Sequence, residues 1–138
     1  MAQKYTVLIV DDDKFLLDMY RKKFESSGTV VDVAVGSNEA LSKLRGGAKP
    51  DILILDIIMP GMDGLELLGA IRKEKLSPDS TVIMLTNESS REKIEEAKKL
   101  GIKGYIVKAT SIPSEVVEEA LKIANLNSPG GKTNNRNA

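Results

Sequence analysis

The chain has 138 residues, its 20 lysine and arginine residues are balanced by 20 aspartate and glutamate residues, and it contains neither cysteine nor histidine. This length accommodates about one domain, and the balanced charge argues against a nucleic-acid or membrane-surface partner attracted by bulk electrostatics. The two missing residue types exclude disulfides, thiolate metal sites, and imidazole as a base, metal ligand or phosphoryl carrier.

Short apolar runs alternate with amphipathic segments along the chain. The runs are bounded by turn signals, as is typical of buried parallel strands, and they cover residues 7–10, 30–35, 52–55, 82–85 and 105–107. Each run precedes a segment with helical spacing of apolar residues, and the first segment carries Phe15, Leu16, Met19, Tyr20 and Phe24. Five successive βα units predict an α/β fold with a doubly wound, five-stranded parallel sheet. The predicted strand order is 2-1-3-4-5, the flavodoxin-like (βα)5 arrangement.

Local signals predict where the helices begin and end. Ser37 and Asp63 are placed to cap the second and third helices, Ser89 or Ser90 starts the fourth, and Pro113 suits the first turn of the last. Glycines are expected to end the first, second and fourth helices, at Gly28, Gly46 and Gly101.

We expect one domain over residues 1–126 and a disordered polar tail over residues 127–138, because the tail has nothing to bury. The first apolar run has four residues, which is too short for the core of a signal peptide or for a membrane span. The missing cysteines are compatible with a reducing compartment. A cytoplasmic protein is the expectation.

Four predicted strands end on residues that can bind charged oxygens. In an open α/β sheet, ligands bind outside the carboxyl ends of the strands, at the topological switch point. An all-oxygen acidic set suits a hard cation, and a set with few carboxylates suits Mg²⁺ better than Ca²⁺. The sequence therefore predicts one pocket with a cation site, a nucleophilic acid and two groups for phosphoryl oxygens. The residues are Asp11, Asp12, Asp13, Asp56, Thr86 and Lys108.

Each of these residues has a simpler structural explanation. Asp12 or Asp13 could only cap the first helix, and this explanation is favoured for Asp13. Thr86 could be a strand-end residue bonded to backbone, and Lys108 could be an ordinary solvated lysine. The simpler explanation is weakest for the carboxylates of Asp11, Asp12 and Asp56 taken together, because like charges this close require a cation or raised pKa values.

Several segments resemble the receiver domain of two-component response regulators, particularly the single-domain chemotaxis type. The similarity covers residues 5–126. Its most specific part is the Asp-x-x-Met-Pro-x-Met-Asp-Gly pattern that begins at Asp56, combined with the acidic pair, threonine and lysine at matching intervals. The segments concerned are Leu8-Ile9-Val10-Asp11-Asp12, Leu55-Asp56-Ile57-Ile58-Met59-Pro60-Gly61-Met62-Asp63-Gly64, Leu85-Thr86 and Gly104-Tyr105-Ile106-Val107-Lys108.

The resemblance implies a role for each residue of the pocket. Asp56 would be the phosphoacceptor, which attacks the phosphohistidine of a histidine kinase or a histidine phosphotransfer protein. Asp12 and Asp56 would bind Mg²⁺ directly, together with the backbone carbonyl of Ile58, and Asp11 would help to position the ion through water. Carboxylate nucleophiles and positioning by metal and ammonium groups fit phosphoryl-transfer chemistry. Such a domain is not an enzyme beyond its own phosphorylation and dephosphorylation.

The resemblance also implies a switch and an output surface. Thr86 would hydrogen-bond one phosphoryl oxygen and Lys108 would pair with another. The threonine would then move and Tyr105 would turn inward, although Tyr105 could also be a half-buried tyrosine with no switching role. The output would be read by a downstream protein on the face formed by the fourth helix, the fifth strand and the fifth helix. Direct nucleic-acid binding and membrane association are not expected.

Three positions depart from the family pattern. Ala109 stands where the family usually has a proline in a cis bond; a cis bond to alanine costs about 3 kcal/mol, so we predict a trans Lys108–Ala109 bond. Asn87 is bulkier than the small residues common after the threonine and could narrow access to the phosphoryl group. Ile58 is apolar and could shield the acyl phosphate from water.

Two other functions fit part of the pattern. A phosphatase of the haloacid dehalogenase type also uses an Asp-x-Asp pattern, which Asp11–Asp13 satisfies, followed by a strand-end threonine and a lysine. It needs a further acidic pair, however, and only the glutamates of the last predicted helix follow Lys108. The other alternative is a receiver-like interaction module that is never phosphorylated.

Overall fold

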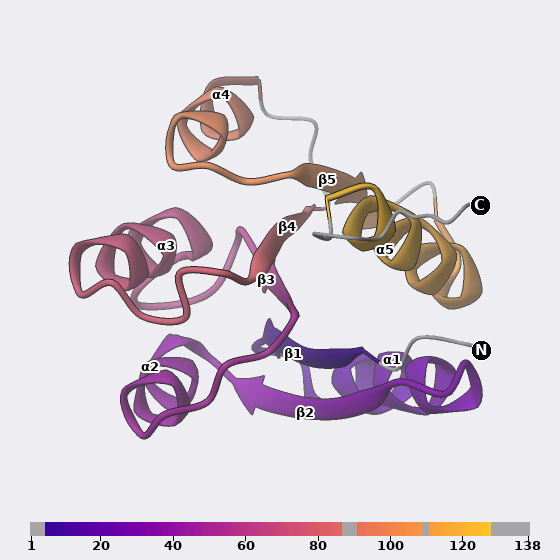
Figure 1. Ribbon diagram of the computed structural model, residues 1–138. Coiled ribbons are helices and arrows are strands. Elements are labelled where there is room, and N and C mark those ends of the chain that lie inside the picture. Colours follow the sequence, from indigo (N-terminus) through magenta and orange to yellow (C-terminus); the bar gives the residue numbers. More distant parts are fainter. Residues whose placement is uncertain (1–4, 87–90, 109–110, 128–138) are drawn as a thin grey trace.

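The computed structural model describes residues 5–86, 91–108 and 111–127, where strands and helices alternate (Figure 1). The strands form one parallel sheet in the order β2-β1-β3-β4-β5, which confirms the predicted topology. They are β1 (Thr6–Asp11), β2 (Val30–Val35), β3 (Ile52–Asp56), β4 (Thr81–Thr86) and β5 (Gly104–Val107). The helices are α1 (Lys14–Ser26), α2 (Ser37–Arg45), α3 (Gly64–Lys73), α4 (Arg91–Lys99) and α5 (Pro113–Asn127).

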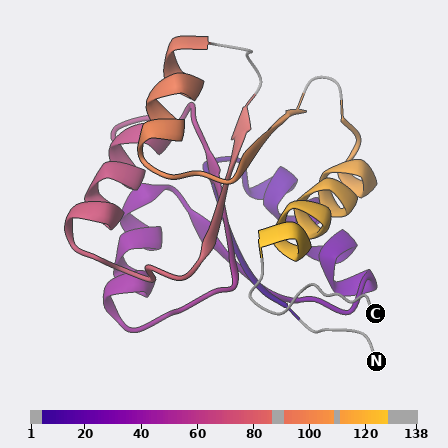
Figure 2. The same ribbon diagram turned by 45° about the horizontal axis from the view of Figure 1, so that its top comes forward.

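The sheet lies between two helical layers. Helices α2, α3 and α4 cover one face, and α1 and α5 cover the other (Figures 1 and 2). Every residue of β3 and β4 is buried. These central strands are continuously apolar because both of their faces contact helices.

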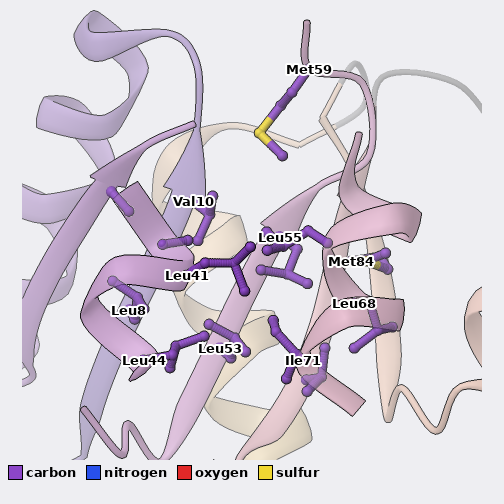
Figure 3. Packing of buried hydrophobic residues seen from close by; sticks show 14 of the residues in the cluster. Leu8, Val10, Leu41, Leu44, Leu53, Leu55, Met59, Leu68, Ile71 and Met84 are labelled. Carbon is purple, nitrogen blue, oxygen red and sulfur yellow. The ribbon is translucent and has the colours of Figure 1, made fainter. Parts of the chain in front are cut away.

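Side chains alternate between the two layers along each strand. Leu53 and Leu55 of β3 pack toward α2 and α3, against Leu68 and other residues of those helices (Figure 3). Ile52 and Ile54 belong to the opposite core layer, beneath α1 and α5. This alternation determines the face to which each strand-end residue belongs.

Both predicted aspartate caps are present. The Asp13 carboxylate accepts hydrogen bonds from the backbone N–H groups of Phe15 and Leu16, at 3.0 and 3.2 Å. Asp63 and Glu66 form a reciprocal capping box at the start of α3. Both aspartates act on neighbouring residues of the chain, so local sequence is enough to predict them.

The predicted cap at Ser37 is wrong. Gly36 occupies the N-cap position with φ of +89°, and Ser37 is the first residue of α2. The Ser37 hydroxyl instead donates a hydrogen bond of 2.7 Å to the backbone carbonyl of Met62. The hydroxyl therefore donates to a distant carbonyl, and no side chain caps the start of α2.

The apolar stripe of α1 is also different from the prediction. Phe15 is 75% exposed, whereas Leu17 is buried with Tyr20 and Phe24. Residues two positions apart lie on opposite sides of a helix. The helix therefore buries Leu17 and leaves Phe15 in solvent.

Four expectations concern residues outside the described ranges: the narrowing of access by Asn87, the fourth helix starting at Ser89 or Ser90, the Lys108–Ala109 bond, and the tail beyond residue 127. Helix α5 includes Asn127, which was expected to belong to the tail. In the described ranges, no helix has the length and apolar character to cross a membrane.

Candidate functional site

The predicted site residues come together at the carboxyl edge of the sheet. Asp11, Asp56 and Thr86 are the last residues of β1, β3 and β4, and Lys108 directly follows β5. Asp11 and Thr86 are 1% exposed, Asp56 is 4% exposed, and the Lys108 side chain is 8% exposed. Such burial excludes the explanation of Lys108 as a solvated surface lysine.

Three carboxylates form a candidate cation site. One carboxylate oxygen from each of Asp11, Asp12 and Asp56 lies within 4.8 Å of the other two, and only Asp12 is exposed to solvent. Asp13 lies outside this group because its carboxylate caps α1. The donor set is all oxygen and opens to solvent on one side, which fits a hard cation that keeps part of its water shell.

Lys108 bridges two of these carboxylates. Its ammonium Nζ lies 2.9 Å from Asp11 Oδ2 and 3.3 Å from Asp56 Oδ2. Asp11 is further held by a hydrogen bond of 3.0 Å that its Oδ1 accepts from the Asp13 backbone N–H. Asp11 is therefore oriented from two sides, whereas Asp56 has a longer contact with the ammonium.

The electrostatics of the site make Asp56 the unusual carboxylate. Burial and the charge of Asp11 raise the pKa of Asp56 to about 6, although Lys108 opposes the shift. Burial alone would lower the pKa of Lys108, but its hydrogen bond with Asp11 and the charges of Asp56 and Asp11 outweigh burial and raise it. The lysine is therefore fully charged at neutral pH, and the ionised form of Asp56 is held in an unfavourable environment. A cation would relieve the repulsion between the carboxylates.

Thr86 and Tyr105 belong to the other side of the sheet. The side chain of Thr86 points to the same face of the sheet as that of Met84, two positions earlier. Met84 packs in the core layer beneath α2 and α3. Tyr105 precedes Ile106, which belongs to the layer beneath α1 and α5, so the tyrosine alternates to the same side as Thr86. Tyr105 is 43% exposed. The two residues assigned to the switch therefore share one face of the sheet.

The loop after Asp56 requires glycine at position 64. The Gly64 N–H donates a hydrogen bond of 2.8 Å to the carbonyl of Ile57. A Cβ at Gly64 would collide with the backbone carbonyl oxygen of Asp56. The signal was present as the glycine that ends the Met-Pro-Gly-Met-Asp-Gly stretch. Because Gly64 has no side chain, the first residue of α3 can pack directly against the backbone of Asp56.

Residues 7–120 match the model of the response regulator receiver domain family. The chain therefore belongs to the response regulator receiver domains, the phosphoacceptor domains of two-component signalling systems.

Relatives and solved structures agree with this family. The chain is 35% identical over 119 residues to the chemotaxis protein CheY of Thermotoga maritima, an alignment that covers 86% of this chain and 96% of that protein. It is similar to the structure of CheY4 of Vibrio cholerae, with a TM-score of 0.79, 31% identity, and coverage of 88% and 99%. It is also similar to the response regulator TrrA of Thermotoga maritima in complex with Mg²⁺ and BeF, with a TM-score of 0.72, 33% identity, and coverage of 86% and 98%.

The family decides between the functions that the sequence left open. Receiver domains accept phosphate from histidine kinases and act as signalling domains rather than classical enzymes. They bind Mg²⁺ at an acidic site, and an acidic cluster is present here. The haloacid dehalogenase-type phosphatase and the non-phosphorylated interaction module are not favoured.

Proposed function

We propose that Asp56 accepts a phosphoryl group from a partner phosphohistidine in a Mg²⁺-dependent reaction. The observation that carries this proposal is the position of Asp56. It is a buried carboxylate within 4.8 Å of two others and 3.3 Å from an ammonium group. Asp56 is thus the only member of the acidic cluster that also begins the Asp-x-x-Met-Pro pattern.

Asp12 and Asp56 are the proposed direct ligands of Mg²⁺, together with the backbone carbonyl of Ile58, and Asp11 helps to position the ion through water. The exposure of Asp12 supports this division, because an open side leaves room for water and a phosphoryl oxygen. When bound, Mg²⁺ neutralises charge on the phosphoryl oxygens. The side chains of the site then need only to position the reacting atoms.

In the proposed reaction, a carboxylate oxygen of Asp56 attacks the phosphorus atom in line with the phosphorus–nitrogen bond of the donor. The new oxygen–phosphorus bond forms as the phosphorus–nitrogen bond breaks, and the imidazole leaves with the electron pair of that bond. Lys108 pairs with one phosphoryl oxygen, and the Thr86 hydroxyl donates a hydrogen bond to another. Catalysis by this chain is limited to its own phosphorylation and dephosphorylation.

The proposed switch connects Thr86 to Tyr105. Thr86 moves toward the phosphoryl group, and Tyr105 turns from its half-exposed position into the space beside it. The shared face of these two residues supports this pairing, as does the narrow apolar stripe of α4, in which Ile94 and Ala97 are buried between exposed charged residues. An element with little buried apolar area costs little to shift.

The proposed partners follow from the same reaction. The phosphodonor is a histidine kinase or a histidine phosphotransfer protein, in a phosphorelay that we place in the cytoplasm. The output partner is a protein that binds the face formed by α4, β5 and α5. We propose no direct contact with nucleic acid or membrane.

Phosphorylation can be tested without the cognate kinase. The protein is incubated with acetyl phosphate and Mg²⁺, and its intact mass is measured. We expect a gain of one phosphoryl group in the wild type and in Asp79→Asn, which changes an exposed aspartate in the turn before β4. Asp56→Asn should not gain this mass. A wild-type rate of phosphorylation in Asp56→Asn would refute the proposal.

A further inference from the structure

Tyr20 is a buried residue in the core layer on the same side of the sheet as Asp11 and Asp56. It lies in α1, is 4% exposed, and belongs to the same core layer as Ile9, Ile54 and Ile106. Ile9 and Ile54 precede Asp11 and Asp56 by two positions in β1 and β3, and Lys108 follows the end of β5. Side chains two positions apart share a face of a sheet, so Asp11 and Asp56 continue the layer that contains Tyr20, and Lys108 contacts both of them.

The phenol of Tyr20 reaches toward these charges. Helix α1 begins at the carboxyl edge of the sheet, and long helical side chains point back toward the helix N-terminus. Burial raises the pKa of Tyr20, and the nearby charges of Lys108, Asp11 and Asp56 also act on it. The hydroxyl is therefore protonated at neutral pH and lies within electrostatic reach of the site.

The Tyr20 hydroxyl and the Lys108 ammonium both have unused hydrogen-bonding capacity. None of the described residues forms a hydrogen bond with the Tyr20 hydroxyl, although buried hydroxyls are normally paired. An ammonium group has three N–H donors. Asp11 and Asp56 accept two of those of Lys108, and no other described residue accepts the third.

Phosphorylation would increase the need for such a partner. On the proposed function, the Asp56 carboxylate becomes an acyl phosphate, and Lys108 moves from that carboxylate to one of the phosphoryl oxygens. The contacts that hold Lys108 between Asp11 and Asp56 in this structure must then be rearranged. A buried ammonium is stable only while its donors are satisfied.

We propose that Tyr20 is a positioning residue for Lys108, whose hydroxyl oxygen accepts a Lys108 N–H, directly or through one buried water, when Lys108 pairs with the phosphoryl group on Asp56. This inference rests on the proposed phosphorylation of Asp56. Helix α1, through Tyr20, would then contribute to the affinity of the site for a phosphoryl group, as the residues at the strand ends do.

The test compares two tyrosine-to-phenylalanine changes, with beryllofluoride and Mg²⁺ as the probe that mimics a phosphoryl group. Tyr20→Phe should weaken binding of the probe about tenfold in a calorimetric titration. The matched control is Tyr5→Phe, which removes a hydroxyl at the opposite end of the sheet, 3.5 Å from Asn125 Oδ1. The control should bind as the wild type does. Equal affinity of Tyr20→Phe and wild type would overturn the inference.

A double-mutant cycle separates positioning from a structural effect. In a Lys108→Met background, Tyr20→Phe should cause no further loss of affinity, because the tyrosine acts through the lysine. A tenfold loss in both backgrounds would show an effect independent of Lys108 and refute the inference. A second readout is the ¹³Cζ resonance of Tyr20, which should shift when the probe binds to the wild type and remain unshifted with Lys108→Met.

The stability of the metal-free protein distinguishes a positioning role of Tyr20 from a packing role. Tyr20→Phe removes a hydroxyl that has no hydrogen-bond partner among the described residues, so the urea midpoint of the metal-free protein should not fall. A fall that accompanies the weaker binding would indicate a packing role. If the wild type neither binds beryllofluoride nor gains a phosphoryl group, the proposed function itself is wrong. If the wild type does both and Tyr20→Phe matches it, only the role of Tyr20 is wrong.

Discussion

The Lys108 ammonium lies 2.9 Å from a carboxylate oxygen of Asp11, although β3 and β4 separate β5 from β1 in the sheet. The two side chains are 8% and 1% exposed. The lysine therefore extends across the carboxyl edge of the sheet and over Asp56, which it contacts at 3.3 Å. Because Lys108 contacts both carboxylates, a change in the charge of Asp11, Asp56 or Lys108 affects the other two.

Removal of the Asp56 charge should stabilise the metal-free protein at neutral pH. Folding raises the pKa of Asp56 from 3.8 to about 6. The folded state therefore binds the proton more tightly than the unfolded state, and the free energy of unfolding falls as pH rises between these values. One pKa unit corresponds to about 1.4 kcal/mol, so a shift from 3.8 to about 6 should make Asp56→Asn more stable than wild type by about 3 kcal/mol at pH 7.5. Urea unfolding of both proteins measures this difference.

The same titration contains its own control, because Asp56 is protonated in both states at low pH. The advantage of Asp56→Asn should shrink as pH falls through about 6 and be small near the ordinary carboxyl pKa of 3.8. A constant difference between the two proteins across this range would show that Asp56 does not titrate as the structure implies.

Asp12→Ala and Asp13→Ala should have different effects. Asp12→Ala should weaken Mg²⁺ binding at least tenfold, because Asp12 belongs to the acidic cluster. Asp13→Ala should change Mg²⁺ binding little but lower the free energy of unfolding by about 1 kcal/mol, the usual effect of losing an N-cap. A metal titration and a urea melt on each variant distinguish the two roles. Equal losses of metal affinity would contradict the assignment.

Gly64→Ala should be strongly destabilising. The added Cβ would collide with the backbone carbonyl of Asp56, so either α3 or the strand end must move. We expect a loss of about 2–4 kcal/mol, in the range of severe packing errors, and slower phosphorylation of the fraction that folds. The matched control is Gly69→Ala in α3, where no atom lies within 4 Å of the added Cβ. This control should be stabilised by about 0.5–1 kcal/mol, since alanine is the better helix former.

Ile58→Asn should accelerate dephosphorylation. Ile58 is two residues after Asp56 and 51% exposed, so a polar side chain there could orient water toward the acyl phosphate. Decay of the phosphorylated protein can be followed by intact mass after removal of the donor. Ile112→Asn changes an apolar residue that is similarly exposed, at 60%, just before α5, and serves as the control. Unchanged or slower decay in Ile58→Asn would refute the shielding role of the isoleucine.

Much of the fold could be predicted because its signals are local or periodic. Continuous apolar runs indicated strands buried on both faces, and the alternation with helices indicated the parallel order of the sheet. The caps at Asp13 and Asp63 act within three residues of themselves. The carboxyl ends of parallel strands lie on one edge, so Asp11, Asp56, Thr86 and Lys108 could be assigned to one site before any contact was known.

Tertiary structure decided everything that depends on a distant partner. The hydroxyl of Ser37 donates to a carbonyl 25 residues away instead of capping its own helix. Asp11 and Lys108 pair across 97 residues, and the raised pKa of Asp56 follows from burial beside them. The sequence does not indicate that the Tyr20 hydroxyl has no hydrogen-bond partner among the residues that the structure describes. Hydrogen-bond satisfaction and desolvation depend on which atoms surround a group in space, and periodicity along the chain carries no record of them.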